Sequence, residues 1–219
     1  MGLNKSKGNM YDWVTHTWSP IIGCPHQCSY CYVKAFREQP VKPILRNDFP
    51  PLGKGRTIFV GHLCDMFASA TPEDMVQKVL DHCGKYWENK YVFQTKNPAR
   101  YFDFSIPGNA TVGTTIETNR WDILARISKA PSPQGRAAAI SNVKRERFIT
   151  IEPILDFDTE SFVDLIQNAA VDFVNIGADS KRHNLPEPTR EKVQELIEAL
   201  TARGIVIRKK VNLGRLLKR

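Results

Sequence analysis

Three cysteines within eight residues carry the clearest chemistry in this sequence. Cys24, Cys28 and Cys31 have C-x3-C-x2-C spacing, and Tyr30 and Tyr32 flank the third cysteine. Three thiolates on one short loop can bind three irons of a cubic iron–sulfur cluster and leave the fourth iron without a protein ligand. An open coordination position favours catalysis, whereas a closed site usually serves structure. The spacing therefore predicts a metal site that is either open or, with a fourth ligand, closed.

Zinc is the main alternative occupant of this loop. The three cysteines with His26 or Cys64 as the fourth ligand would form a closed structural site. Small zinc motifs usually show a second C-x2-C or Cys/His pair, which this sequence lacks. The other thiol, Cys83, falls on the apolar face of a predicted helix and is interpreted as a small core residue.

Length and composition predict one domain over residues 1–219. The chain has 42% hydrophobic residues, enough for a full core, and no apolar run long enough to cross a bilayer. We see no signal peptide, and an odd number of cysteines with three clustered is typical of metal binding in a reducing compartment. We therefore expect a soluble, cytoplasmic protein.

The net charge of +8 is concentrated at one end of the chain. Residues 203–219 contain seven Lys or Arg residues and no Asp or Glu, whereas the rest is nearly neutral. Such a basic C-terminal tail could bind nucleic acid or another polyanion. It could equally be a solvated segment that only aids solubility. Both interpretations stay open at this point.

The elements that position the cysteines are short strands alternating with helices. Strands are predicted at 17–22, 57–61, 90–95, 110–116, 147–151, 172–176 and 205–207. Helices are predicted at 32–38, from a Thr71 N-cap with Pro72 as the first helical residue, from about 119, at 159–169 and at 188–203. Residues 40–56 read as a loop and 130–142 as a connection, and His82 is expected to be exposed. The alternation predicts an α/β fold with a mostly parallel sheet, helices outside, and an open or partial (β/α) barrel.

Polar residues follow every predicted strand. In parallel α/β folds, ligands gather at the carboxyl ends of the strands. Any single case is weak, since Glu152 could be a loop carboxylate, a salt-bridge partner or a ligand contact. Polar residues after every strand, together with the cysteine loop after the first one, predict a binding site. The main candidates are Gly61, His62, Cys64, Asp65, Gln94, Lys96, Thr115, Glu117, Glu152 and Asp179.

The cysteine segment resembles the cluster motif of the radical S-adenosylmethionine (radical SAM) superfamily. The matching pattern is Gly23-Cys24-x3-Cys28-x-Tyr30-Cys31-Tyr32. Residues 18–24 look like those of a phage-associated, largely uncharacterised branch. The similarity continues at 58–67, 93–98, 112–117 and 150–153, and so covers most of the chain.

The resemblance implies a partial (β/α)6-type radical SAM barrel and a set of site residues. The three cysteines would bind a 4Fe-4S cluster, whose fourth iron would take the amino and carboxylate groups of S-adenosyl-L-methionine. Residues 61–64 would stand at the family's Gly-Gly-Glu motif, although Gly-His-Leu-Cys-Asp departs from it. The implied contacts to the cofactor come from Gly61, His62, Asp65 in the acidic role, Thr115 or Glu117 at the ribose, Arg126 at the carboxylate, Tyr30 near the adenine, and Glu152.

The implied reaction begins when the cluster passes one electron to the sulfonium. The products are methionine and a 5′-deoxyadenosyl radical that removes hydrogen from a substrate, with flavodoxin or ferredoxin as the electron donor. Cys64 could return a hydrogen atom to the substrate radical, or could be a small buried residue. His62 could be an acid/base or a hydrogen-bonded support. The alternative from another class is a zinc- or iron–sulfur-containing barrel that binds nucleic acid without catalysis.

Overall fold

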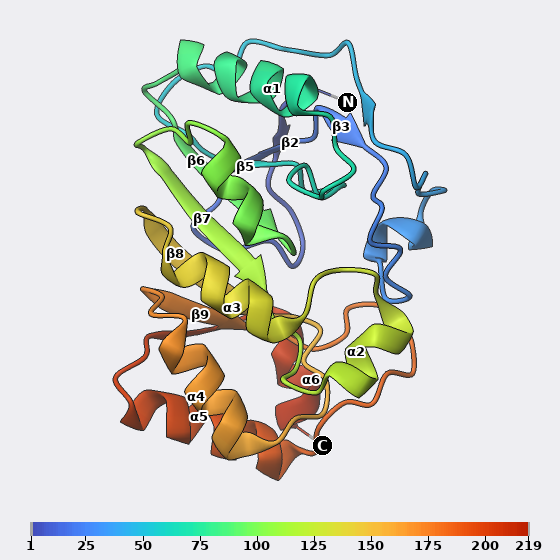
Figure 1. The fold of residues 1–219 in the computed structure, drawn as a ribbon, viewed down its shortest axis with the longest axis vertical. Coiled ribbons are helices and arrows are strands. Elements are labelled where there is room, and N and C mark those ends of the chain that lie inside the picture. Colours follow the sequence, from blue (N-terminus) through green and yellow to red (C-terminus); the bar gives the residue numbers. More distant parts are fainter. Residues whose placement is uncertain (1, 219) are drawn as a thin grey trace.

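The computed structural model describes residues 2–218 and contains one eight-stranded sheet with helices outside it (Figure 1). The strand order is β1-β2-β5-β6-β7-β8-β9-β10, and every neighbouring pair except β1–β2 is parallel. The predicted α/β class with a mostly parallel sheet is confirmed. The strands are β1 (Asn4–Lys5), β2 (His16–Trp18), β5 (Thr57–Val60), β6 (Lys90–Thr95), β7 (Ala110–Thr115), β8 (Glu146–Ile151), β9 (Phe173–Ile176) and β10 (Ile207–Lys209).

Helices connect the successive parallel strands of the sheet. The α-helices are α1 (Glu73–Lys85), α2 (Trp121–Ile127), α3 (Pro133–Ser141), α4 (Thr159–Asn168), α5 (Arg190–Ala202) and α6 (Gly214–Leu217). Short 3-10 helices occur at η1 (Tyr32–Ala35), η2 (Pro98–Asp103) and η3 (Val211–Leu213), and a small antiparallel pair joins β3 (Ile21–Ile22) to β4 (Ile44–Leu45). None of the described helices combines the length and apolarity that a membrane span requires.

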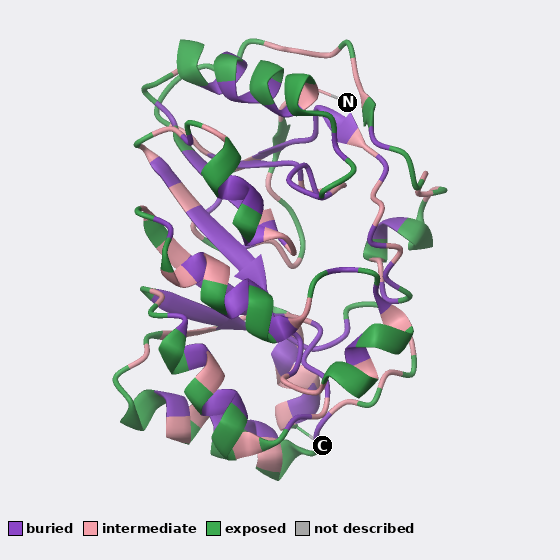
Figure 2. Cartoon of the chain, in the orientation of Figure 1, coloured by how far each residue is buried: buried purple, intermediate pink, exposed green. Residues whose placement is uncertain are grey.

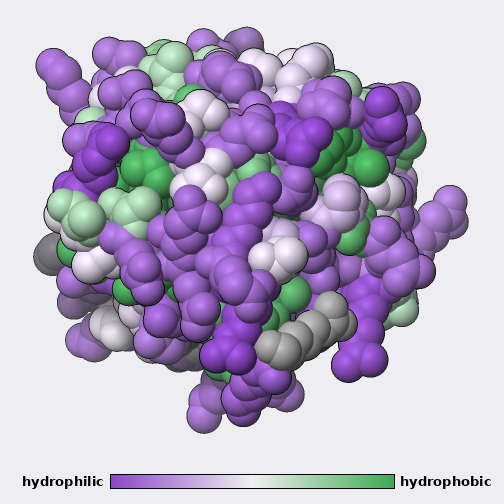
Figure 3. Space-filling model, turned by 90° about the horizontal axis from the view of Figure 1, so that it is seen from below, coloured by the Kyte–Doolittle hydropathy of each residue, from purple (hydrophilic) through white to green (hydrophobic). Residues whose placement is uncertain are grey.

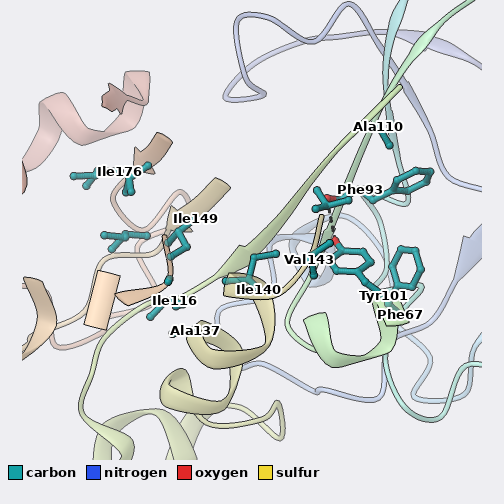
Figure 4. Close-up of a cluster of buried hydrophobic side chains, with 14 of the residues drawn as sticks. Phe67, Phe93, Tyr101, Ala110, Ile116, Ala137, Ile140, Val143, Ile149 and Ile176 are labelled. Atoms are coloured by element: carbon teal, nitrogen blue, oxygen red, sulfur yellow. Dashed lines mark hydrogen bonds between the residues drawn. The ribbon is translucent and has the colours of Figure 1, made fainter. Parts of the chain in front are cut away.

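The main core lies between the sheet and its helices. In Figure 2 the helix faces turned toward the sheet are buried and their outer faces are exposed. α1 buries Val76, Val79, Leu80 and Cys83, the stripe predicted from its i, i+3, i+4, i+7 spacing. Phe93 and Ile149 from the strands meet helix side chains such as Ile140 in one continuous cluster (Figure 4).

The other face of the sheet is filled by an N-terminal segment, residues 10–14, which we call the plug. Tyr11 and Val14 are buried with Phe59, Val92, Phe148 and Phe173, and Met10 and Trp13 pack against this second cluster. The Trp13 ring lies edge-on to Phe173, with centroids 5.8 Å apart. Because a Cβ at Gly113 would lie 2.3 Å from the Phe148 ring, only glycine fits there. The plug was not predicted from the sequence.

Several predicted boundaries are wrong, each for a local reason. The strand expected at 17–22 is divided between β2 and β3, and α1 begins at Glu73 with Pro72 as its N-cap, one residue later than predicted. The 130–142 connection contains α3, whose N-cap Ser132 accepts a hydrogen bond from the Gly135 amide at 3.2 Å. The helix expected at 32–38 is only the short η1.

His82 is buried, contrary to prediction. It lies against the rings of Trp18 and Phe49, with centroids 5.0 and 5.2 Å away. Its Nε2 is 2.9 Å from the Pro50 carbonyl. The 40–56 loop folds over α1 and covers this side chain, which helical periodicity alone cannot reveal.

The basic segment 203–219 is built into the fold over its described part rather than forming a free tail. It contains β10, η3 and α6, and the last strand lies two residues later than predicted because Ile207 pairs with Val174 of β9. Arg203, Lys210 and Arg215 form ion pairs with Asp164, Glu152 and Glu187, respectively. Hydrophilic side chains dominate the face seen from below, and hydrophobic ones appear there in small separate groups (Figure 3).

Candidate functional site

A large cavity lies at the carboxyl ends of the parallel strands. Its volume is about 1260 Å³, and pockets for a drug-sized ligand usually measure roughly 300–1,000 Å³. The structure brings most of the predicted site residues to its lining, from the cysteine loop and from the exits of β5, β6, β7, β8 and β9. These are Cys24, Cys28, Tyr30, Cys31, Gly61, His62, Cys64, Asp65, Gln94, Lys96, Thr115, Glu152 and Asp179.

Backbone hydrogen bonds fix the cysteine loop, residues 23–31, at both ends. The Cys24 amide donates to the Pro40 carbonyl at 2.7 Å, and the Ser29 amide donates to the Ile127 carbonyl at 2.8 Å. Gly23 has φ +86° and no room for a Cβ, which would lie 2.3 Å from the Lys42 carbonyl oxygen. Glycine at this position is therefore required by both conformation and space.

The three cysteines of the loop share one cavity. All three are free thiols that line the same cavity. Within residues 2–218, no three His, Cys, Asp or Glu side chains are grouped closely enough to hold a single metal ion. Burial raises the pKa of Cys24 to about 12, so a bound cation is needed to stabilise its thiolate.

Neither proposed fourth zinc ligand joins the three cysteines in such a group. His26 is buried, and its Nε2 lies 2.9 Å from Oδ2 of Asp65. Asp65 also accepts from the Thr95 hydroxyl at 2.6 Å and the Lys96 amide at 2.7 Å. Burial alone would raise the pKa of Asp65, but its hydrogen bonds and His26 lower it. Asp65 thus ties the cysteine loop to the exits of β5 and β6.

Glu117 is the centre of a buried charge network behind the cavity wall. Oε2 lies 2.7 Å from the guanidinium of Arg136, and both side chains are fully buried. Oε1 accepts from Lys96 and from the hydroxyl of Tyr30 in the cysteine loop. Burial raises the pKa of this carboxyl, but Arg136 and then Lys96 outweigh it and hold the pKa far below 4.5. Glu117 does not line the cavity, whereas Thr115, the other residue expected at the ribose, does.

A hydrogen-bonded floor joins the plug to the strand exits. The Tyr11 hydroxyl lies 2.6 Å from the Thr150 hydroxyl and donates to Gln94. The Gln94 amide donates to the Thr115 hydroxyl at 2.8 Å. Tyr11 and Thr150 both line the cavity but were missed from the sequence. Thr150 could have been found from the sequence, because it is the next-to-last residue of β8. Tyr11 could not, because its position depends on how the plug packs.

His62 and Cys64 occupy the turn after β5. Nδ1 of His62 lies 2.7 Å from the Ser19 hydroxyl, and burial followed by the Arg37 charge lowers its pKa to about 4. The ring is therefore neutral at pH 7. Burial raises the pKa of Cys64 well above 9, so its thiol keeps the proton. Gly61 has φ +82°, which brings this turn back over the cavity.

Glu152 lies on another part of the lining and remains partly exposed. Oε2 pairs with Lys210 at 2.6 Å, and Oε1 accepts from Asn9 at 2.6 Å and from Asn212 at 2.7 Å. Asn9 precedes the plug and Asn212 lies in η3, so one carboxylate joins segments that are far apart in the sequence. Arg126 is exposed on α2 and does not line the cavity. The structure therefore does not place Arg126 where it was expected to meet the cofactor carboxylate.

Comparison by sequence finds no relatives: no family model matches the chain, and no curated protein is similar to it. Comparison by structure finds solved structures of similar fold. A cysteine variant of spore photoproduct lyase superposes with a TM-score of 0.61 at 13% identity, covering 87% of this chain and 63% of the other. The architecture is a radical SAM fold.

Two other solved structures agree with this fold. SuiB of Streptococcus suis, bound to S-adenosylmethionine, gives a TM-score of 0.59 at 10% identity over 88% of this chain and 49% of SuiB. A radical SAM methyltransferase from Sphaerobacter thermophilus gives 0.55 at 13% identity over 91% of this chain and 67% of the enzyme. The chain thus spans less than two thirds of spore photoproduct lyase and about half of SuiB. The expected partial barrel is confirmed.

Proposed function

We propose that this protein is a radical SAM enzyme. Cys24, Cys28 and Cys31 would hold a 4Fe-4S cluster, and S-adenosyl-L-methionine would bind beside it in the cavity. The observation that carries the proposal is the fixed cysteine loop, whose three free thiols face a cavity at the strand exits of a radical SAM fold. The substrate is an organic molecule that loses a hydrogen atom, and nucleic acid is one candidate.

The cluster held by Cys24, Cys28 and Cys31, with S-adenosylmethionine beside it, would supply reductive cleavage to methionine and a 5′-deoxyadenosyl radical able to take hydrogen from the substrate. The protein's own residues bind and orient. The hydrogen bonds of the cysteine loop keep its thiols in place, and Thr115 offers a hydroxyl from the β7 exit. Neutral His62 presents no charge to repel the sulfonium.

Cys64 is our candidate for returning a hydrogen atom to the substrate radical. The thiyl radical left on its sulfur would take one electron from the donor protein and one proton, which restores the thiol. Cys64 lines the cavity, takes part in no disulfide and keeps its S–H at neutral pH. Cys64→Ala removes this donor without adding volume. We expect S-adenosylmethionine cleavage to continue while the normal product is lost. Full turnover to the same product by this variant would show that Cys64 is not the hydrogen-atom donor and only packs in the cavity wall.

The test of the proposed function is anaerobic reconstitution followed by addition of S-adenosylmethionine and dithionite. We expect about four irons per chain, broad visible absorption and formation of 5′-deoxyadenosine. The triple variant Cys24→Ala, Cys28→Ala, Cys31→Ala should lose all three, whereas Cys83→Ala should keep them because Cys83 lies on the buried face of α1 and does not line the cavity. Stoichiometric zinc without iron after reconstitution would overturn the proposal.

Three finer expectations belong to the same proposal. The physiological electron would come from a small donor protein such as flavodoxin or ferredoxin. The enzyme would work in the cytoplasm, where cluster thiols stay reduced. The residues around Trp18 to Cys24 support membership of a phage-associated branch of the superfamily.

A further inference from the structure

The cavity contains more lysine than its acidic residues can neutralise. Its lining includes six lysines but three carboxylates, all from residues 2–218. The lysines are Lys5, Lys7, Lys34, Lys96, Lys181 and Lys210, and the carboxylates are Asp65, Glu152 and Asp179. A cavity of this charge attracts anions.

Each of the three carboxylates already has a nearby partner. Asp65 is bound to His26, and Glu152 is paired with Lys210. Asp179 lies 2.7 Å from Nδ1 of His183 and accepts from two backbone amides of its own turn. None of these contacts involves Lys5, Lys7 or Lys181.

Four of these lysines have no acidic partner among the described residues: Lys5, Lys7, Lys34 and Lys181. Lys34 donates instead to the Cys28 carbonyl at 3.0 Å, and we call the other three, Lys5, Lys7 and Lys181, the rim lysines. All three rim lysines are exposed, whereas Lys96 pairs with Glu117. The rim lysines come from segments that touch each other. Asn9, two residues after Lys7, donates to the Ser180 hydroxyl beside Lys181 at 3.4 Å.

Exposed aromatic side chains lie at the same cavity. Tyr32 lines the cavity and is 39% exposed, and Phe36 beside it is 55% exposed. Their ring centroids are 6.1 Å apart. Open aromatic faces near lysines are typical of proteins that stack nucleobases while binding phosphates, and are not needed for a simple carboxylate.

We infer that the rim lysines bind a phosphate ester of the substrate, so that its base-bearing part enters the cavity. This inference rests on the proposed function, because the reacting centre is taken to lie inside the same cavity. The phosphate can belong to a free nucleotide or to a polynucleotide, since lysine recognises it as a point charge in both. The rim, rather than the ion-paired segment 203–218, is then the electrostatic contact for substrate.

The test is equilibrium binding of fluorescent probes to the anaerobically reconstituted protein across a range of NaCl concentrations. The probes are single-stranded DNA, the same sequence as a duplex, a nucleoside monophosphate and polyglutamate. For Lys5→Glu, Lys7→Glu, Lys181→Glu we expect at least about tenfold weaker DNA binding, and a salt slope smaller by about 2 for single strands. Tight mononucleotide binding that is lost in this variant would identify a free nucleotide as the source.

The matched control is Lys54→Glu, Lys85→Glu, Lys144→Glu, which reverses three exposed lysines outside the cavity. A second control, Lys209→Glu with Lys218→Glu, tests the C-terminal segment. Equal loss of binding in either control, or equal affinity for polyglutamate, overturns the rim assignment. Thermal unfolding midpoints verify that each variant is folded.

The inference and the proposed function fail in different ways. If the wild-type protein cleaves S-adenosylmethionine but binds neither DNA nor the nucleotide, the inference is wrong and the function stands. If DNA binds through the rim lysines but no cluster forms, the proposed function is wrong, and the rim serves a binding protein instead.

Discussion

Glu117 and Glu152 leave neighbouring parallel strands at the same end of the sheet, yet they lie in different surroundings. Glu117 is fully buried among Arg136, Lys96 and Tyr30, behind the cavity wall. Glu152 keeps part of its surface exposed and lines the cavity. Both were predicted as cofactor contacts on the same reasoning. A carboxylate after a strand can therefore line the cavity, as Glu152 does while paired with Lys210, or turn to cations behind the cavity wall, as Glu117 does.

Glu117→Gln should have the largest effect, because it removes the negative charge from a buried pair. Arg136 would be left as an uncompensated buried cation, and we expect the free energy of unfolding to fall by about 3–5 kcal/mol. The Tyr30 contact would weaken as well, so cluster content after reconstitution should drop. Denaturant unfolding and iron quantitation measure both effects. A loss below about 1 kcal/mol would contradict the role of this network.

Glu152→Gln should cost less, about 1–3 kcal/mol, because the amide can keep the hydrogen bonds from Asn9 and Asn212. Lys210 would become an unpaired cation at the cavity. We therefore expect DNA to bind more tightly to this variant, the opposite of its effect on stability. Glu88→Gln, an exposed control, should change neither quantity. Weaker DNA binding by Glu152→Gln would show that Glu152 does not neutralise Lys210 at the cavity.

Acid unfolding should reveal the lowered pKa of Glu117. The pKa of Glu117 is held far below 4.5, so its contribution is complete above that pH and is lost as the pH falls further. The unfolded chain then binds a proton that the folded chain does not. Wild-type stability should fall more steeply below pH 4.5 than that of Glu117→Gln, by at most about 1.4 kcal/mol per pH unit. Parallel curves for the two proteins would show that the carboxyl titrates normally.

Arg126→Ala should have the smallest effect. The side chain is exposed on α2 and away from the cavity, so stability should stay within about 0.5 kcal/mol of wild type. Binding of S-adenosylmethionine should be unchanged, as measured by calorimetry on the reconstituted protein. A large loss of affinity would indicate that Arg126 does contact the cofactor carboxylate, and that α2 moves when the cofactor binds.

Local sequence patterns were sufficient for the central strands and their exits. The strands β5 to β9 are short apolar runs bounded by polar residues, and α1 shows a full apolar stripe. α3 was missed because Pro133 to Ser141 is alanine-rich and has little apolar asymmetry. β10 was misplaced because its register depends on pairing with β9, which spacing along the chain does not reveal.

The parts of the site that could not be predicted depend on long-range contacts. Tyr11 reaches the floor only because the plug packs against Phe148 and Phe173. Arg136 reaches Glu117 only because α3 exists, and its burial as a charged residue contradicts composition-based expectation. The three cysteines were found readily because their spacing is local.

The wall that joins Asn9, Glu152 and Asn212 has a consequence for the order of events during synthesis. The Asn212 amide donates to Oδ1 of Asn9 at 3.4 Å, across more than two hundred residues. Contacts of such sequence separation form late because the intervening chain must first be ordered. A nascent chain therefore exposes its three thiols long before this wall can close. Under the proposed function, these thiols would be open to iron and sulfide during that interval.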